Sequence, residues 1–127
     1  MAIIKKLVGI KGFNIRIQSC PIVREKDGLA MSSRNKLLNE EERAAAPLIY
    51  QLLTFVQSSF NKKGPKHIAA LVKESIENSS LFELEYFTIV DVKNLHPMVA
   101  FDPHQKYRAF IAVKTSKIRL IDNIKLG

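Results

Sequence analysis

The order of the secondary-structure patterns between residues 39 and 125 constrains the fold most, because two helical segments come first and three strand segments follow. Asn39 is a favourable N-cap, and three glutamates fill the first turn after it, where carboxylates favour the positive end of the helix dipole. Glu42 occupies the capping-box position. We therefore expect a helix to begin after Asn39. Pro47 should kink it near residues 43–46, because proline removes one backbone donor.

A second helix is predicted over residues 65–79, with Pro65 as its first residue, after a loop at residues 61–65. Apolar side chains recur at helical spacing in both helices and define the faces that should be buried. These are Ala44, Leu48, Ile49, Leu52, Leu53 and Val56 in the first helix, and Ile68, Leu71, Val72 and Ile76 in the second.

Strand patterns follow over residues 84–92, 107–113 and 118–125. Residues 94–104 read as a loop, and residues 114–117 as the turn between the last two strands. A chain of 127 residues suits one domain with a sizeable core. Helices followed by strands predict an α+β fold with two layers, one of which is a small antiparallel sheet.

The N-terminal part of the chain carries two shorter patterns. Residues 3–10 place apolar side chains at near-helical spacing, which predicts a short amphipathic helix. Phe13, Ile15 and Ile17 then alternate with polar residues, which predicts a half-buried strand. Pro21 should end or bend that strand.

The composition favours a folded protein in a reducing compartment. Hydrophobic residues make up 46% of the chain, yet no apolar run approaches the length needed to cross a bilayer, and we expect neither a membrane span nor a signal peptide. Cys20 is the one cysteine, so no internal disulfide can form, which favours the cytoplasm. A reactive thiol and an inert one are both open for Cys20. The inert reading is favoured because free cysteines are usually buried.

The net charge of +8 is unevenly distributed. Residues 1–36 carry eight basic and two acidic side chains, residues 37–104 carry six and nine, and residues 105–127 carry six and one, giving +6, −3 and +5. A polyphosphate substrate would account for the first cluster, and an acidic protein surface for part of the rest. Binding to nucleic acid is less favoured, because the sequence shows no recognition motif.

The loop from Pro21 to Asn35, PIVREKDGLAMSSRN, carries the chemistry. Asp27 and Gly28 signal a turn, and small residues follow whose backbone N–H groups can approach an anion closely. Arg34 would supply a permanently charged, planar fork for phosphate oxygens. The alternative is a solvated turn followed by a helix cap, since serine and asparagine are common in both places.

The same fifteen residues resemble the signature of the pantothenate synthetase (pantoate–beta-alanine ligase) family, which belongs to the nucleotidyl-transferase group related to class I aminoacyl-tRNA synthetases. NEEERAAAPLIYQLL, YFTIVDVKNL and RLIDNI resemble later segments of that family, in the same order. The resemblance covers nearly the whole chain, but only the C-terminal portion of the family. It implies that residues 1–127 form one C-terminal domain, excised or truncated from a longer protein. Residues 1–12 would be the remnant of the helix that leads to an N-terminal Rossmann-like domain.

The resemblance also implies roles for residues of the loop. The family's counterpart of this loop closes over the ATP phosphates, so the domain is expected to be an ATP-binding lid. Arg24 and Asp27 match the motif, and a mutual ion pair that shapes the turn is expected. The RLIDN segment, residues 119–123, is expected to be structural. ATP binding is assigned to Val23, Met31, Ser32, Ser33 and Arg34, and a catalytic role to Ser32, Ser33 and Arg34.

Two positions depart from the family pattern. Ser116 stands where a glycine is usual, which puts the geometry of the last hairpin in doubt, and Val92 stands where proline often follows the aspartate. Neither position belongs to the nucleotide loop.

The family reaction joins pantoate to beta-alanine at the expense of ATP, through a pantoyl adenylate, with release of pyrophosphate and AMP. ATP would act as its Mg²⁺ complex, and the full-length protein would be a cytoplasmic homodimer. The 127-residue chain alone is expected to fold without turnover. One alternative is a basic adaptor that binds nucleotide or RNA. Another is an interaction module that associates through Ile3, Ile4 and Leu7.

The remaining candidate residues favour structural readings. The histidines are dispersed and none has a second ligand at metal spacing, so no metal ligand is assigned. The aromatic residues of the C-terminal half suit strand cores better than stacking platforms for bases. The histidines are His67, His96 and His104, and the aromatic residues are Tyr86, Phe87, Phe101, Tyr107 and Phe110.

Overall fold

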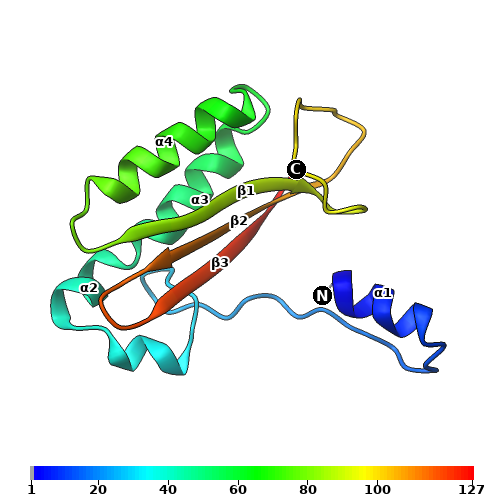
Figure 1. Cartoon of the computed structure of the whole chain (residues 1–127), viewed down its shortest axis with the longest axis horizontal. Helices are drawn as coiled ribbons and strands as arrows, with labels where there is room; N and C mark the ends of the chain where they lie inside the picture. Colours follow the sequence, from blue (N-terminus) through cyan, green and yellow to red (C-terminus); the bar gives the residue numbers. More distant parts are fainter. Residues whose placement is uncertain (1) are drawn as a thin grey trace.

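The computed structural model describes residues 2–127 and has the α+β architecture that the sequence predicts (Figure 1). Helices α3 and α4 cover one face of a three-stranded sheet, and α1 stands apart at the end of a long extended segment. The elements are α1 (Ala2–Ile10), the 3-10 helix η1 (Ser33–Leu37), α2 (Glu40–Ala45), α3 (Leu48–Ser59), α4 (Pro65–Glu77), β1 (Glu83–Asp91), β2 (Tyr107–Lys114) and β3 (Arg119–Leu126).

The sheet is antiparallel, in the order β1-β2-β3. Ile111 at its centre pairs with Phe87 on one side and with Asp122 on the other. The β2–β3 hairpin is closed by the Thr115 N–H, which donates to the Ile118 carbonyl at 2.8 Å. Serine at position 116, where the family pattern favours glycine, therefore leaves the hairpin closed.

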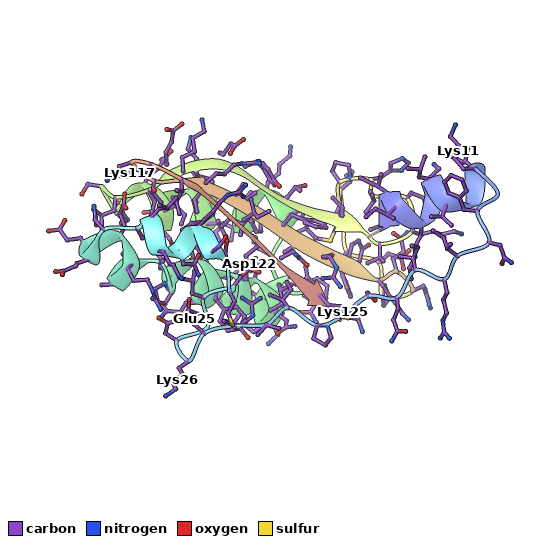
Figure 2. The ribbon with its side chains drawn as sticks, turned by 90° about the horizontal axis from the view of Figure 1, so that it is seen from below. Lys11, Glu25, Lys26, Lys117, Asp122 and Lys125 are labelled. Atoms are coloured by element: carbon purple, nitrogen blue, oxygen red, sulfur yellow. The ribbon has the colours of Figure 1, made fainter. Side chains whose placement is uncertain are left out.

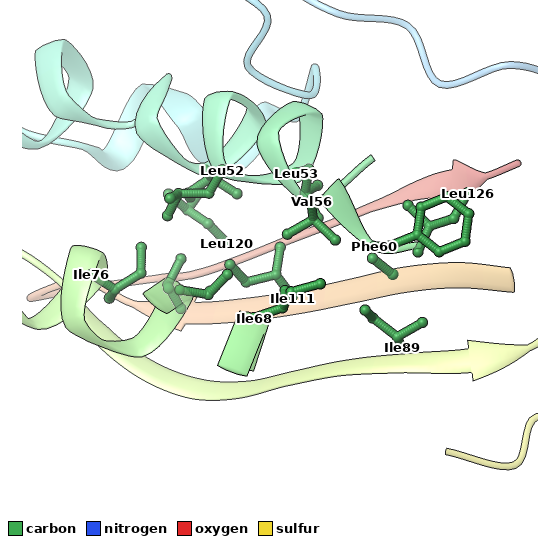
Figure 3. Packing of buried hydrophobic residues seen from close by; sticks show 14 of the residues in the cluster. Leu52, Leu53, Val56, Phe60, Ile68, Ile76, Ile89, Ile111, Leu120 and Leu126 are labelled. Atoms are coloured by element: carbon green, nitrogen blue, oxygen red, sulfur yellow. The ribbon is translucent and has the colours of Figure 1, made fainter. Parts of the chain in front are cut away.

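The core lies between the helices and the sheet (Figure 3). Leu53 of α3 and Ile68 of α4 are fully buried against Ile111 of β2, as their spacing predicts. Removing such side chains from water is the largest favourable contribution to folding. Two expectations need correction: Ala44 is exposed on α2, and Leu71 is only half-buried on α4.

The first predicted helix divides at Pro47 instead of kinking. Its start is as expected, because Asn39 Oδ1 accepts from the Glu42 N–H at 2.8 Å and Glu42 Oε2 accepts from the Asn39 N–H at 3.0 Å. The helix then stops at Ala45, and α3 begins at Leu48. Proline lacks the N–H that would continue the backbone ladder, so the chain turns there.

The strand predicted over Phe13–Ile17 is wrong. These residues run as an extended segment, and Phe13 and Ile15 are exposed. A strand needs a neighbour to satisfy its backbone, and nothing in residues 2–127 pairs with this one. The apolar alternation was real, but it did not identify a partner.

Helix α1 forms as predicted, and its apolar side chains are largely exposed. Ile3, Leu7 and Ile10 face the turn at residues 93–96 across a recess of about 480 Å³. None of the helices over residues 2–127 is long and apolar enough to cross a membrane.

The aromatic residues only partly follow the strand-core expectation. Tyr107 is buried in β2, and Phe87 and Phe110 are half-buried. Tyr86 is exposed on β1. Phe101 is also exposed and lies outside the strands, with its ring edge-on to Phe60 at 5.4 Å between centroids.

Candidate functional site

The predicted loop begins as a small hairpin. The Met31 N–H donates to the Val23 carbonyl at 2.9 Å, and Arg24 and Ala30 form an antiparallel bridge beside it. These bonds bring Val23 next to Met31, although they are eight positions apart in the chain. The open end of the hairpin, at Val23 and Met31, is therefore exposed to solvent, and Ser32 follows it directly.

Gly28 closes the hairpin at a position where no side chain fits. Its φ of 93° lies in the left-handed region. A Cβ atom there would lie 2.3 Å from the Tyr50 ring. The turn predicted at Asp27 and Gly28 therefore has two reasons for its glycine: backbone conformation and the close approach of Tyr50.

The three proposed phosphate residues lie together at the start of η1. Ser32 is the N-cap, and its Oγ accepts from the Arg34 N–H at 3.2 Å. Ser32, Ser33 and Arg34 are all exposed. Arg34 is exposed, and within residues 2–127 its guanidinium makes no hydrogen bond or ion pair, so its donors are available to an anion. The cap and the anion site, which the sequence posed as alternatives, are compatible.

Asn35 anchors the far end of the loop. Its Nδ2 donates to Glu25 Oε1 and to the Ala30 carbonyl, both at 3.1 Å. The side chain is buried, and Oδ1 accepts from no group in the part of the chain that the structure describes. A buried acceptor of this kind is normally satisfied by a water or a ligand donor.

A pocket of about 240 Å³ separates the loop from the edge strand β3. Met31, Ser32 and Arg34 line it from the loop, and Ile121 and Asp122 line it from β3. Larger recesses of about 480 and 510 Å³ lie around the turn after β1 and include none of the loop residues. The smaller pocket is the candidate phosphate site, because Ser32 and Arg34 lie at its rim. A recess of about 410 Å³ also has guanidinium and hydroxyl donors, but none of residues 31–34 lines it.

The expected ion pair between Arg24 and Asp27 is wrong. Arg24 instead pairs with Asp122, its Nη1 lying 2.6 Å from Oδ2 and its Nη2 3.0 Å from Oδ1. Asp27 pairs with Arg43 of α2, at 2.6 Å between Oδ2 and Nη1. The hydrogen bond from Arg43 lowers the pKa of the Asp27 carboxyl. The two hairpin residues face opposite ways, one toward the sheet and the other toward α2.

Figure 2 shows the hairpin in profile, with Lys26 at its tip pointing away from the body of the domain and Asp122 on β3. The cluster of Arg24, Asp122 and Tyr50 was missed by sequence reasoning. One signal was available: Asp122 falls on the same face of β3 as Leu120 and Leu126, which are buried. A carboxylate on a core face needs a partner.

A second buried carboxylate ties α2 to the β2–β3 hairpin. Glu42 Oε1 accepts from the Ser116 Oγ–H at 2.7 Å and from the Ser116 N–H at 2.9 Å. The Ser116 hydroxyl and the Asn39 N–H lower the pKa of the Glu42 carboxyl. A glycine at position 116 could donate only the backbone hydrogen bond to Glu42, whereas Ser116 adds a second one from its hydroxyl.

Glu42 predicts a pH dependence of stability. A carboxyl whose pKa is lower in the folded state stabilises the fold above its unfolded pKa, and this contribution is lost as pH falls through the folded value. We expect Glu42→Gln to lower the urea midpoint of unfolding near neutral pH. The difference in midpoint between this variant and the unchanged protein should narrow below about pH 4. Glu77→Gln, which removes an exposed carboxyl of α4, is the control. A gap that stays constant down to about pH 3 would contradict this role.

The other candidate residues from the sequence are exposed and do not gather into a second site over residues 2–127. Val23 is exposed and free to contact a flat apolar ring. Cys20 is exposed, so burial does not support the inert reading that was favoured for its thiol. All three histidines are exposed. Over residues 2–127, no group of three or more His, Cys, Asp or Glu side chains gathers closely enough to hold a metal ion.

Known proteins match this chain along its whole length. A family model described as pantoate-beta-alanine ligase matches residues 1–125. The pantothenate synthetase of Flavobacterium psychrophilum is 44% identical over 126 residues, which are 99% of this chain and 45% of that protein. That of Christiangramia forsetii is 39% identical over 127 residues, covering 100% of this chain and 45% of that protein.

A solved structure agrees with the fold. The crystal structure of pantothenate synthetase from Thermus thermophilus superposes with a TM-score of 0.86 at 29% identity, over 98% of this chain and 45% of that one. The chain therefore spans about half the length of the curated relatives that it matches.

Proposed function

Because this chain belongs to the pantoate–beta-alanine ligase family, we propose that it supplies the ATP-binding lid of a ligase that makes pantothenate. One observation carries the proposal: Arg34 is exposed and unpaired within residues 2–127, at the rim of a pocket that Ser32 also lines. A permanent cation held free of internal partners is suited to an anionic substrate. The chain's excess of basic residues over positions 1–36 favours the same substrate class.

In the proposed reaction, the pantoate carboxylate attacks the α-phosphate of ATP, and pyrophosphate leaves with its bonding electrons. The amine of beta-alanine then attacks the acyl carbon and displaces AMP. Negative charge builds on the leaving pyrophosphate in the first step. Arg34 would stabilise that charge, and the Ser32 and Ser33 hydroxyls would donate to phosphate oxygens.

The loop would bind ATP along its length. Val23 and Met31 are neighbours across the hairpin, and both side chains are exposed. They would contact the adenine end, while the residues after Met31 hold the phosphates. Mg²⁺ would arrive as part of the substrate, bridging phosphates and keeping several of its waters. Closure of the domain over a second, substrate-binding domain would exclude water from the adenylate.

The corresponding assay measures pantothenate formed from ATP, pantoate and beta-alanine. A ligase that carries this chain as its C-terminal domain should form pantothenate, and the 127-residue chain alone should form none. Residues 1–12 would connect the two domains. An inactive longer protein, together with strong and salt-sensitive retention of RNA by the chain, would favour the basic adaptor instead. The cytoplasmic location and the homodimer stay predictions.

A further inference from the structure

The exposed residues of the loop have few contacts that could fix their place relative to the sheet. Ser32 and Arg34 bond to each other through the capping contact, and Asn35 bonds back to the hairpin. All of these bonds lie within residues 23–35. The position of the loop on the domain therefore depends on what holds the hairpin stem.

Leu29 and Arg24 join that stem to the rest of the fold. Leu29 is buried in the core and attaches the hairpin through apolar packing. Apolar packing of one side chain restricts its distance from the core more than its orientation, because hydrophobic attraction is not directional. Arg43 adds bonds to Asp27 and Glu25, but its side chain and both carboxylates are about one-third exposed.

Arg24 supplies the directional contacts. Its guanidinium donates two bonds to Asp122 and a third to the Gly28 carbonyl at 2.9 Å. The same group lies over the Tyr50 ring, 3.9 Å from its centroid. The Arg24 side chain is 18% exposed and that of Asp122 is 4% exposed. A bidentate pair at this depth fixes both the distance and the angle between hairpin and strand.

The partner residue, Asp122, lines the pocket of about 240 Å³ from β3, and Ser32 and Arg34 line it from the loop. The pair between Arg24 and Asp122 therefore sets how far the loop stands from β3. We propose that Arg24 and Asp122 are positioning residues that hold Ser32 and Arg34 in register for the phosphates of ATP. This inference rests on the proposed function. It assigns to the RLIDN segment the task of aligning the nucleotide loop.

Lysine cannot replace Arg24 in this task. An ammonium group makes a point contact, whereas the guanidinium fork engages both carboxylate oxygens and the turn carbonyl together. Arg24→Lys keeps the positive charge but loses the bidentate geometry that orients the hairpin. Asp122→Asn keeps the size and shape of the side chain but loses its negative charge. Glu83→Gln is the matched control, because it breaks an ion pair with Lys114 on the same sheet, and neither of these residues lines the pocket.

The first measurement is amide hydrogen exchange in the 127-residue chain, which requires no reaction. In Arg24→Lys and Asp122→Asn, we expect exchange to rise roughly tenfold over residues 24–36 while the amides of α3 and β2 keep their protection. Glu83→Gln should leave the exchange of residues 24–36 unchanged. Unchanged exchange there, or an equal rise throughout the domain, would overturn the inference, because the pair would then be irrelevant or merely stabilising.

The second measurement is steady-state kinetics in the ligase that carries this chain. Arg24→Lys should raise the KM for ATP roughly tenfold, with the KM for beta-alanine unchanged, since a displaced loop weakens contacts to the phosphates alone. Equal effects on both substrates would overturn the positioning role. If Arg34→Ala keeps normal activity, the proposed function fails instead, and the exchange result distinguishes the two failures.

Discussion

Arg34→Ala is expected to lower pantothenate formation by about two orders of magnitude in the ligase that carries this chain, which is typical for loss of one transition-state charge contact. The loss should fall mainly on kcat, because charge on the departing pyrophosphate is greatest in the transition state. Folding should be unaffected, since the Arg34 side chain makes no hydrogen bond or ion pair within residues 2–127. The assay follows pantothenate formation at saturating ATP, with the thermal midpoint measured on the same preparations.

Lys36→Ala provides the matched control. Lys36 is an exposed cation two positions along the same 3-10 helix, and it is not among the residues that line the pocket. Its removal tests whether general positive charge near the loop is enough. Normal turnover by Arg34→Ala, or an equal loss in both variants, would show that Arg34 has no specific phosphate contact.

Leu53→Ala should lower the free energy of unfolding by about 2–5 kcal/mol, the range seen when a buried leucine is truncated and its cavity only partly collapses. Leu53 is fully buried on the face of α3 that packs against the sheet. A loss at the upper end of that range would take most of the stability of a small domain. Urea unfolding of the chain, followed by circular dichroism, measures it.

The same substitution at an exposed leucine isolates the burial effect. Leu37 ends the 3-10 helix and is 57% exposed. Leu37→Ala removes the same atoms from a site that water already reaches, so its cost should stay within about 0.5 kcal/mol. Similar losses at Leu37 and Leu53 would contradict the assignment of the core.

Local signals predicted most of the helical layer. The capping box at Asn39 and Glu42 and the proline at the start of α4 act within one turn of the helix, so neighbours in sequence are enough to recognise them. The strand periods were equally local, and β1, β2 and β3 form within one residue of their predicted bounds. The same reasoning failed for Phe13–Ile17, because a strand depends on a partner elsewhere in space.

The features of the loop also separate into those that depend on local sequence and those that depend on distant partners. The sequence alone determined the turn at Gly28 and the permanent charge of Arg34, since each depends on a conformation or charge that its own residue carries. The cap at Ser32 was left open by the sequence, and only the structure shows Arg34 without a partner within residues 2–127. Only the tertiary structure decided that Arg24 pairs with Asp122, 98 positions away, and not with Asp27. Both partners were chemically equivalent carboxylates. The choice was made by the packing of the hairpin on β3 and Tyr50, because a bidentate ion pair needs its two planes aligned and desolvated together.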